Sequence, residues 1–417
     1  MPGNKTKCKN CSGSYVDLPG HVQRRHPDII QDEDMDGGNN SRRRQKLVYA
    51  DFVNKTPGDR VLTCGKGGQL GHPGRTTSTM PRAIGTLPDN TKILQVVAGR
   101  VHTTILTDEH EVYSCGFNDD GTVPVKDLAA DGFADELTVI EFTEEIKKEG
   151  IIVQLTSGAG FIAALTHRGS VIAWGNLRDE NGAFEPHHLF AKMKKGPTVI
   201  IHHKYVQIVK IAAGEHHLVM LSSKGEIYTF GVGSHGQLGN SRRTKKIRTT
   251  YMADVTGKSL HRSVLEKSKL IKFSNIFAGG YWTMAQAMDG RIFACGLNKS
   301  GQLGFEGSNF IIDLLTHSPA FPSDKKWTHI AGVDHIVART DEGEVYRLGL
   351  NTMIKDRYAY GFGYDSVGQL GLGNTYDENK CITFQKRITS AHLNGYKIIS
   401  VTLADKHSVF LAAKINE

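Results

Sequence analysis

The sequence predicts an all-β protein, a β-propeller, from three observations. A turn-and-strand pattern recurs every 53 to 72 residues over most of the chain. Glycine is unusually frequent, at 46 of 417 residues, which suits a fold with many tight turns. Short strands at this spacing, with hardly any helical period between them, are typical of a propeller, whose small sheets, or blades, surround a central axis.

The first half of each repeat is a turn followed by a strand of alternating polarity. Its clearest copies read Ala-Gly-x-x-His and end at His102, His217 and His335. Weaker copies place Phe161, Trp282 and His407 at the equivalent position. We count six repeats, because self-similarity at a fixed period outweighs the local interpretation of any single segment.

The second half of each repeat is a short strand between two glycine turns, as in 225–231, 290–296 and 343–349. Loops ending in Gly-Gln-Leu-Gly follow such strands, at 68–71, 236–239, 301–304 and 368–371. We expect these glycines to adopt positive φ and to let strands approach closely. The leucine is expected to fill the space between neighbouring blades.

The order of the two halves predicts how the propeller closes. The repeats begin with the end of a unit, at 61–71, and finish with the start of one, at 402–412. The N- and C-terminal strands should therefore share one blade, which removes open sheet edges that would invite aggregation. The predicted domains are a propeller over 59–417, a flexible linker over 31–58 and a small N-terminal module over 1–30.

Composition and charge limit the environment and the partners. No run of eighteen apolar residues occurs, and the polar, basic start of the chain lacks a secretory signal, so we expect an intracellular protein without a membrane partner. In that setting the six cysteines should be thiols or metal ligands. The net charge of +8 favours acidic partners such as nucleic acid or an acidic protein surface. We expect a monomer.

The N-terminal module carries four candidate ligands for one zinc ion: Cys8, Cys11, His21 and His26. Two thiolates from a turn and two imidazoles can complete a tetrahedral site, and a segment this small needs the metal to fold. The spacing Cys-x2-Cys-x9-His-x4-His predicts a Cys2His2-like zinc finger. Because the usual interval between the pairs is about twelve residues, a disordered tail with coincidental Cys and His is the alternative.

The linker contains the basic cluster Arg42, Arg43 and Arg44, after a run of acids and Gly-Gly-Asn-Asn. Such a cluster is typical of a nuclear-import signal or of a patch that binds phosphates. We therefore expect a nuclear protein or a tail that binds phosphates. The alternative is a charge run that only keeps the segment soluble.

The paired motifs, Ala-Gly-x-x-His and Gly-x-Val-Tyr-x-x-Gly with Gly-Gln-Leu-Gly, resemble the repeat of the regulator of chromosome condensation family over about 350 residues. The resemblance implies that family's β-propeller, which normally has seven blades, against the six repeats counted here. Either the ring has six blades, or the seventh is hidden or absent. Many unrelated proteins carry this propeller, so the fold alone does not fix the function.

One insertion carries a narrower resemblance. Residues 177–184, just after Ala-Trp-Gly at 173–175, are similar to the β-wedge of the family's exchange factor for the small GTPase Ran. The resemblance implies a guanine-nucleotide exchange factor without covalent chemistry, which prefers the nucleotide-free GTPase and so speeds the loss of GDP or GTP. By position, Arg178 and Asp179 would contact the GTPase, and Leu177 and Phe184 would anchor the wedge. An ordinary exposed loop is the alternative.

The resemblance also implies further GTPase-binding residues, on the wedge and on turns of the same face. They are Glu180, Asn181, Gly182, His102, Asp119, Glu215, His216, Asp334, His335 and His407. For the recurring histidines, the alternative is a structural role in which they bond the neighbouring backbone. Three departures predict weaker exchange or an altered partner: Ala159 and His216 where the family has acids, and Asn240 where it has arginine.

A long basic loop follows the second Gly-Gln-Leu-Gly motif, with Arg242, Arg243, Lys245, Lys246 and Arg248. It resembles the family loops that meet the acidic patch of the histone core, where arginine forms forked hydrogen bonds with carboxylates. The resemblance implies a chromatin-associated protein, with DNA as a further contact, whereas the alternative is a solvated surface. No Gly-x-Ser-x-Gly, Walker or His-Glu-x-x-His motif supports covalent catalysis. The competing functions are a propeller that binds without exchanging nucleotide and a zinc-finger chromatin adaptor.

Overall fold

The computed structural model divides the chain into two compact units, Met1–Gln45 and Lys46–Glu417. The described residues are 6–7, 14–15, 46–88, 90–129, 131–177, 188–239, 265–266, 269–305, 310–333, 336–348, 353–355, 358–373, 381–404 and 406–415. In the first unit, β1 (Thr6–Lys7) and β2 (Ser14–Tyr15) pair antiparallel. The candidate zinc ligands Cys8, Cys11, His21 and His26 lie outside the described residues, and the zinc finger stays a prediction.

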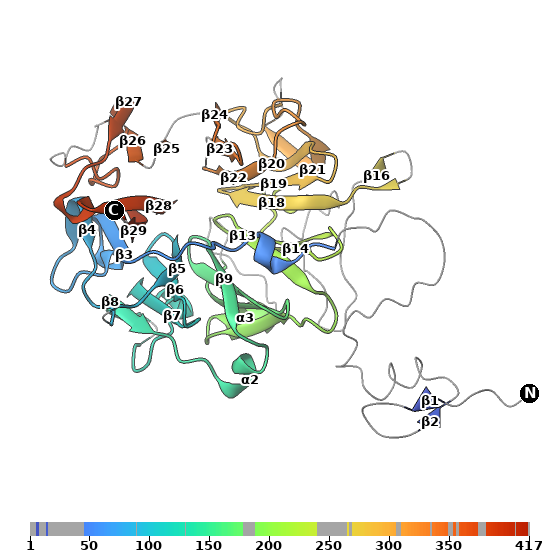
Figure 1. Ribbon diagram of the computed structural model, residues 1–417, viewed down its shortest axis with the longest axis horizontal. Helices are drawn as coiled ribbons and strands as arrows, with labels where there is room; N and C mark the ends of the chain where they lie inside the picture. Colours follow the sequence, from blue (N-terminus) through green and yellow to red (C-terminus); the bar gives the residue numbers. More distant parts are fainter. Residues whose placement is uncertain are drawn as a thin grey trace, which may run out of the picture. The chain divides into compact units, whose positions relative to one another are not determined.

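The described part of Lys46–Glu417 contains seven antiparallel sheets of three or four strands, which confirms the all-β fold (Figure 1). Four of these sheets have four strands each. The first contains β5 (Ile93–Ala98), β6 (His102–Thr107), β7 (Val112–Phe117) and β8 (Phe133–Val139), and the second contains β9 (Ile152–Ser157), β10 (Phe161–Thr166), β11 (Val171–Gly175) and β12 (Thr198–Ile201). The third contains β18 (Phe273–Gly279), β19 (Trp282–Ala287), β20 (Ile292–Leu297) and β21 (Ile311–His317), and the fourth contains β28 (Tyr396–Leu403), β29 (His407–Lys414), β3 (Arg60–Lys66) and β4 (Thr77–Ala83).

Three sheets have three described strands: β13 (Ile208–Ala213) with β14 (His217–Ser222) and β15 (Ile227–Gly231); β22 (Trp327–Ala331) with β23 (Ile336–Thr340) and β24 (Val345–Leu348); and β25 (Met353–Lys355) with β26 (Tyr358–Tyr364) and β27 (Cys381–Arg387). A short pair, β16 (Leu265–Glu266) and β17 (Lys269–Leu270), stands apart from them. The helical elements described are α2 (Glu144–Lys147), α3 (His188–Met193), η2 (Tyr49–Asp51), η3 (Gly68–Leu70), η4 (Asp119–Gly121) and η5 (Ala391–Leu393). Among the described residues, no helix is long and apolar enough to cross a membrane.

The N- and C-terminal strands share one sheet, as the order of the repeat halves predicted. The strand order is β28-β29-β3-β4, and Val409 of β29 lies opposite Thr63 of β3. The last strand is therefore paired on both sides, by β28 and by β3.

Six sequence repeats give seven sheets because the span from β22 to β27 holds two of them. β24 is the third strand of its sheet, the position after which a Gly-Gln-Leu-Gly loop is expected. The Gly-Gln-Leu-Gly loop with Gly368 and Gly371 instead follows β26. The sheet of β25 to β27 has no Ala-Gly-x-x-His turn of its own. The Ala-Gly-x-x-His motif therefore does not reveal this seventh sheet.

Apolar side chains from adjacent sheets pack against each other to form the core. One cluster joins Leu106 of β6 to Ile162 and Trp174 of the next sheet, and another joins Trp282 to Trp327. These three tryptophans are fully buried. The hydrophobic effect therefore holds sheet to sheet, as a propeller requires.

The Gly-Gln-Leu-Gly loops join neighbouring sheets through one repeated arrangement. The carbonyl of Gln237 accepts hydrogen bonds from Thr283 Oγ1 at 2.8 Å and Cys295 Sγ at 3.7 Å in the next sheet. Equivalent contacts join Gln69 to Thr103 and Cys115, and Gln369 to Ser408 and Cys64. The second glycines, Gly71, Gly239, Gly304 and Gly371, have φ of 67–76°, and Leu70, Leu238, Leu303 and Leu370 are buried. The predicted positive φ is confirmed for these glycines, and the predicted place of the leucine between blades is confirmed for Leu303, which packs with both Trp282 and Trp327.

The first strands of successive sheets are linked by long polar side chains. Gln95 bonds both the N–H and the carbonyl of Leu155, and Gln154 Oε1 accepts from the N–H of Ile211 at 3.0 Å. Further along, Lys210 Nζ donates to Asn275 Oδ1 at 2.6 Å, and burial lowers the pKa of Lys210 to about 7. These bonds join the first strands of neighbouring blades.

Residues 46–58 belong to the propeller, although the sequence predicted a linker there. Leu47 donates its N–H to the carbonyl of Ser223 at 3.1 Å, and η2 lies against β13 (Figure 1). Tyr49 and Phe52 pack on the core, and Gly58 pairs with Ile93. Apolar residues in the stretch explain the difference, because they gain more from burial than a solvated linker would.

Candidate functional site

The strand registers place two kinds of loop at the same end of the blades. In the sheet of β9 to β12, Phe161 lies opposite Gly175 at one end. At the other end, Ile152 lies opposite Thr166 and Val171 lies opposite Ile201. The turns after the first strands and the loops after the third strands therefore share one end. We call this end the turn face and define it by residues 99–101, 117–122, 158–160, 176–177, 214–216, 232–236 and 280–281.

Backbone hydrogen bonds connect the turns of four successive blades. The N–H of Arg100 donates to the carbonyl of Ala159 at 2.9 Å, and the N–H of Ala159 donates to Glu215 at 2.8 Å. The N–H of Glu215 in turn donates to Gly280 at 2.9 Å. Two of the positions that the family resemblance assigned to GTPase contacts, Ala159 and Glu215, are therefore neighbours.

Charged and aromatic groups gather around Glu215 on the turn face. Glu215 Oε2 lies 3.9 Å from His216 Nε2, and both side chains are partly exposed. The ring of Tyr281 lies 5.9 Å from that of His216 and 4.8 Å from that of His235. Sequence reasoning missed Tyr281 and His235, although Tyr281 directly precedes the Trp282 that marks its repeat.

His102 and His407 are structural, which corrects their interpretation as GTPase contacts. Both side chains are fully buried. His102 Nε2 lies 2.7 Å from Ser157 Oγ, and His407 Nε2 lies 3.1 Å from Thr103 Oγ1. Burial lowers the pKa of each imidazole to about 3, so the rings are neutral. They join neighbouring blades and are not accessible to a partner.

The segment that resembles the β-wedge begins on a buried base. Leu177 is 3% exposed and belongs to the core between the sheets of β11 and β14. The preceding Asn176 donates from Nδ2 to Asp120 Oδ2 at 2.7 Å. Asp120 lies in η4, so the base is fixed to the previous blade.

The chain returns from this segment through α3, a helix that the strand pattern did not predict. Leu189 and Phe190 are buried in the same core as Leu177, and the Phe190 ring lies 5.1 Å from that of Phe230. Lys194, just after the helix, pairs with Asp120 at 2.9 Å. Both ends of the segment therefore meet at Asp120.

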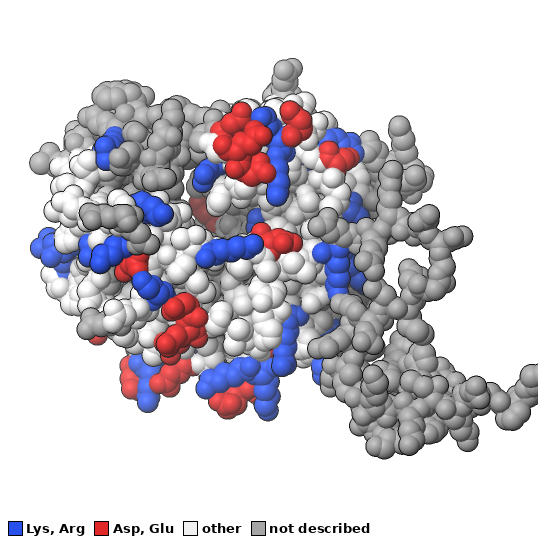
Figure 2. Space-filling model, viewed as in Figure 1, with Lys and Arg blue, Asp and Glu red and all other residues white. Residues whose placement is uncertain are grey.

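Asp119 lies in η4 and is partly exposed, whereas the remaining predicted site residues lie outside the described residues. They are Arg178, Asp179, Glu180, Asn181, Gly182, Asp334 and His335 for the GTPase, and Arg42, Arg43, Arg44, Arg242, Arg243, Lys245, Lys246 and Arg248 for chromatin. On the face shown in Figure 2, acidic and basic side chains of the described residues are interspersed. The positive net charge does not gather into one patch there.

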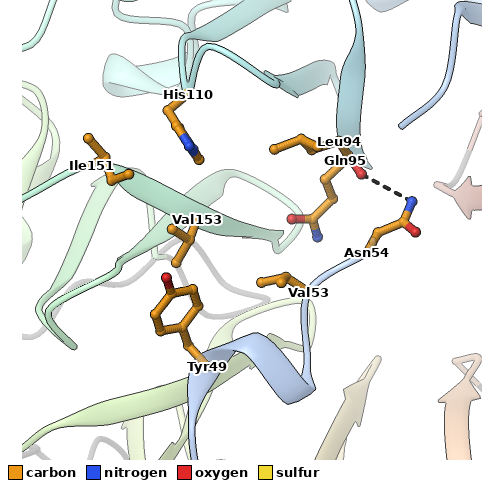
Figure 3. A pocket seen from close by; sticks show the side chains of 8 residues that line it. All are labelled: Tyr49, Val53, Asn54, Leu94, Gln95, His110, Ile151 and Val153. Carbon is orange, nitrogen blue, oxygen red and sulfur yellow. Dashed lines mark hydrogen bonds between the residues drawn. The ribbon is translucent and has the colours of Figure 1, made fainter. Parts of the chain in front are cut away.

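A cavity of about 140 Å³ lies at the end opposite the turn face (Figure 3). It is lined by Tyr49, Val53, Asn54, Leu94, Gln95, His110, Ile151 and Val153. Its polar side chains bond strand backbones: Asn54 donates to the Leu94 carbonyl at 3.3 Å, and His110 Nδ1 lies 2.8 Å from the Ile152 carbonyl. The cavity is thus a junction between residues 46–58 and two blades.

Comparison with known proteins identifies the family. A family model described as an RCC1-like domain matches residues 60–355. The human regulator of chromosome condensation is 32% identical over 358 residues, which cover 82% of this chain and 77% of that protein. The chain belongs to the RCC1-like domain family.

The chain is also similar to a relative and to a solved structure from Saccharomyces cerevisiae. The guanine nucleotide exchange factor SRM1 is 25% identical over 370 residues, covering 80% of this chain and 70% of that protein. The solved structure of Prp20p, described together with its binding to Gsp1p and histones, has a TM-score of 0.59 and 21% identity, covering 91% and 97% of the two chains. The structural match confirms the RCC1-like propeller fold.

Proposed function

We propose that this chain is a guanine-nucleotide exchange factor for a Ran-type small GTPase and that it acts on chromatin in the nucleus. The observation that carries the proposal is the anchored insertion after β11. Leu177 before it and Phe190 after it are both buried in one core, and Asp120 contacts both sides of the base. An ordinary surface loop needs no such support.

A rigid base suits an exchange factor because exchange depends on a preference for one state of the partner. A protein that binds the nucleotide-free GTPase more tightly lowers the barrier to nucleotide loss, by no more than that difference in affinity. Side chains held by a preorganised base lose less entropy on contact than those of a mobile loop. Arg178 and Asp179 are the proposed contacts, with Glu180, Asn181 and Gly182 beside them.

The turn face supplies the rest of the proposed interface. Asp119 and Glu215 are acidic and partly exposed at this end, and His216 lies beside Glu215. Ala159 carries no acid, but its N–H bonds the carbonyl of Glu215, so a carboxylate stands on the adjacent turn. We propose that Glu215 replaces part of the charge missing at Ala159.

Chromatin binding is proposed through two basic segments. Arg42, Arg43 and Arg44 form one, and the loop with Arg242, Arg243, Lys245, Lys246 and Arg248 forms the other. The description of Prp20p together with histones supports this part of the proposal. Retention on chromatin through phosphates should weaken steeply with added salt, because binding releases counterions.

The test is the release of a fluorescent GDP analogue from a Ran-type GTPase, with the chain at catalytic amounts. The wild-type chain should accelerate release, and Arg178→Ala should lose at least tenfold of that acceleration, about 1.4 kcal/mol of transition-state stabilisation. Arg168→Ala is the matched control, since Arg168 donates to the Lys148 carbonyl at the end opposite the turn face. No acceleration even at stoichiometric amounts would leave a propeller that binds without exchanging.

A further inference from the structure

A cluster of two imidazoles and a carboxylate lies at the end of the blade opposite the turn face. Its members are Glu149, His202 and His203, and one candidate ligand atom from each lies within 4.8 Å of the others. It is the one such group of three among the residues that the structure describes. We propose that these three side chains bind a zinc(II) ion.

The fold of one blade brings the three residues together. Glu149 follows α2 and precedes β9, and His202 and His203 directly follow β12. Pairing of Val171 with Ile201 places the end of β12 beside the turn between β10 and β11, which contains Ser170. The cluster therefore connects the first and last strands of the blade that carries the wedge-like segment.

Each imidazole lies near a different oxygen of Glu149, at about the separation of two ligand atoms in a tetrahedral zinc site. With Zn–N and Zn–O bonds of about 2.0–2.2 Å, the ligand atoms of a tetrahedral centre lie about 3.3–3.5 Å apart. His202 Nε2 lies 3.3 Å from Glu149 Oε1, and His203 Nδ1 lies 3.5 Å from Glu149 Oε2. The two imidazoles stack with ring centroids 4.5 Å apart, and the ligand atoms of all three residues lie within 4.8 Å of one another.

Ser170 holds the carboxylate of Glu149 and the backbone of His203 in place, a role that outer-shell partners have in metal sites. Its hydroxyl donates to Glu149 Oε2 at 2.5 Å and accepts the N–H of His203 at 3.0 Å. It also lies 3.0 Å from His203 Nδ1, so zinc would replace this contact at the ring. Outer-shell partners fix the orientation of metal ligands, and their removal typically lowers metal affinity 10- to 100-fold.

The residue types favour zinc over calcium or magnesium. Imidazole ligands suit zinc and other late first-row metals, whereas calcium and magnesium require mainly oxygen. Glu149 is only 8% exposed, so its carboxylate needs a positive partner, which zinc supplies. The side chains of His202 and His203 are 29% and 24% exposed, which leaves the fourth position open to water.

The test must separate this site from the predicted zinc finger. We would therefore use the full chain with Cys8→Ser and Cys11→Ser, and titrate it with zinc by calorimetry and with cobalt(II) by visible absorption. The proposal predicts one equivalent of zinc and a tetrahedral cobalt spectrum without sulfur-to-cobalt charge transfer. Zinc should also raise the melting temperature, because it binds only the folded site.

Variants then locate the ion. His202→Gln, at a partly exposed position, and Glu149→Gln should each weaken zinc binding at least tenfold and abolish the thermal shift. His317→Gln, at an exposed histidine of β21, is the matched control and should bind as the parent does. Failure of the Cys8→Ser/Cys11→Ser chain to bind an equivalent would overturn the proposal. Unchanged affinity in His202→Gln and Glu149→Gln would do the same by placing the ion elsewhere.

Discussion

The imidazole of His217 lies 2.9 Å from the hydroxyl of Thr283 in the next blade, and both side chains are buried. The same contact joins His407 to Thr103, and His102 bonds the hydroxyl of Ser157, at the end of the first strand of the next blade. The histidine of the repeat motif is thus a connector between blades. It explains why the motif keeps a polar residue at a position that is buried in His102, His217 and His407.

The buried histidines make stability depend on pH. Burial lowers the pKa of His102, His217 and His407 to about 3, against about 6.5 in the unfolded chain. Below pH 6.5 the unfolded chain takes up protons that the folded chain does not. The free energy of unfolding should therefore be intact above pH 6.5 and fall toward pH 3, by up to about 4 kcal/mol per pH unit for three groups.

Urea unfolding at pH 7.5, 6 and 5 measures this dependence. His217→Gln should reduce the slope by up to about 1.4 kcal/mol per pH unit, since one titrating group is removed. A free energy of unfolding that stays constant from pH 7.5 to 5 would show that the buried rings accept protons in the folded state.

Removing the single hydroxyl group of Thr283 should lower the free energy of unfolding markedly. Thr283→Val keeps the shape but leaves His217 Nε2 without its partner and removes a bond to the Gln237 carbonyl. We expect a loss of about 1–3 kcal/mol in the free energy of unfolding. Thr316→Val, at an exposed threonine of β21, is the control and should cost less than about 0.5 kcal/mol. Equal losses would mean that the connector adds no stability.

Closure between the last sheets can be tested at two glycines with similar φ. Gly371 has φ of 69°, and a Cβ there would lie 3.0 Å from Cys64 Sγ and from Pro81. Gly301 has φ of 67° with nothing within 4 Å of such a Cβ. Both alanine variants carry the left-handed strain of about 1–2 kcal/mol. Gly371→Ala should cost about 1–3 kcal/mol more by chemical denaturation, because the atoms must shift. Similar costs would count against the tight contact with β3.

The two ends of the predicted linker should differ in their effect on stability. Deleting residues 1–45 removes the separate first unit and should leave the melting temperature of the propeller unchanged. Deleting residues 1–58 also removes Tyr49 and Phe52 from the core and the pairing of Gly58 with Ile93. That deletion should lower the free energy of unfolding by about 2–5 kcal/mol. Equal melting temperatures for the two truncations would contradict the placement of 46–58.

Local sequence patterns predicted the strands and the shared closing blade, because glycine turns and the His motif act within one repeat. They could not show that His407 faces Thr103, since the partner is 304 residues away and the motif does not reveal which way a ring points. The cluster of Glu149 with His203 is hidden for the same reason. Ser170, which bonds both, lies 21 and 33 residues from them and joins them only through strand register.

The central claim is that the insertion anchored at Leu177 drives nucleotide release. The most direct measurement replaces residues 178–187 by a Gly/Ser segment of equal length and compares GDP release from a Ran-type GTPase with that of the wild-type chain. We predict that the replaced chain melts at the same temperature but no longer accelerates release. Acceleration that survives the replacement would contradict the claim and move the exchange activity to the turn face around Glu215.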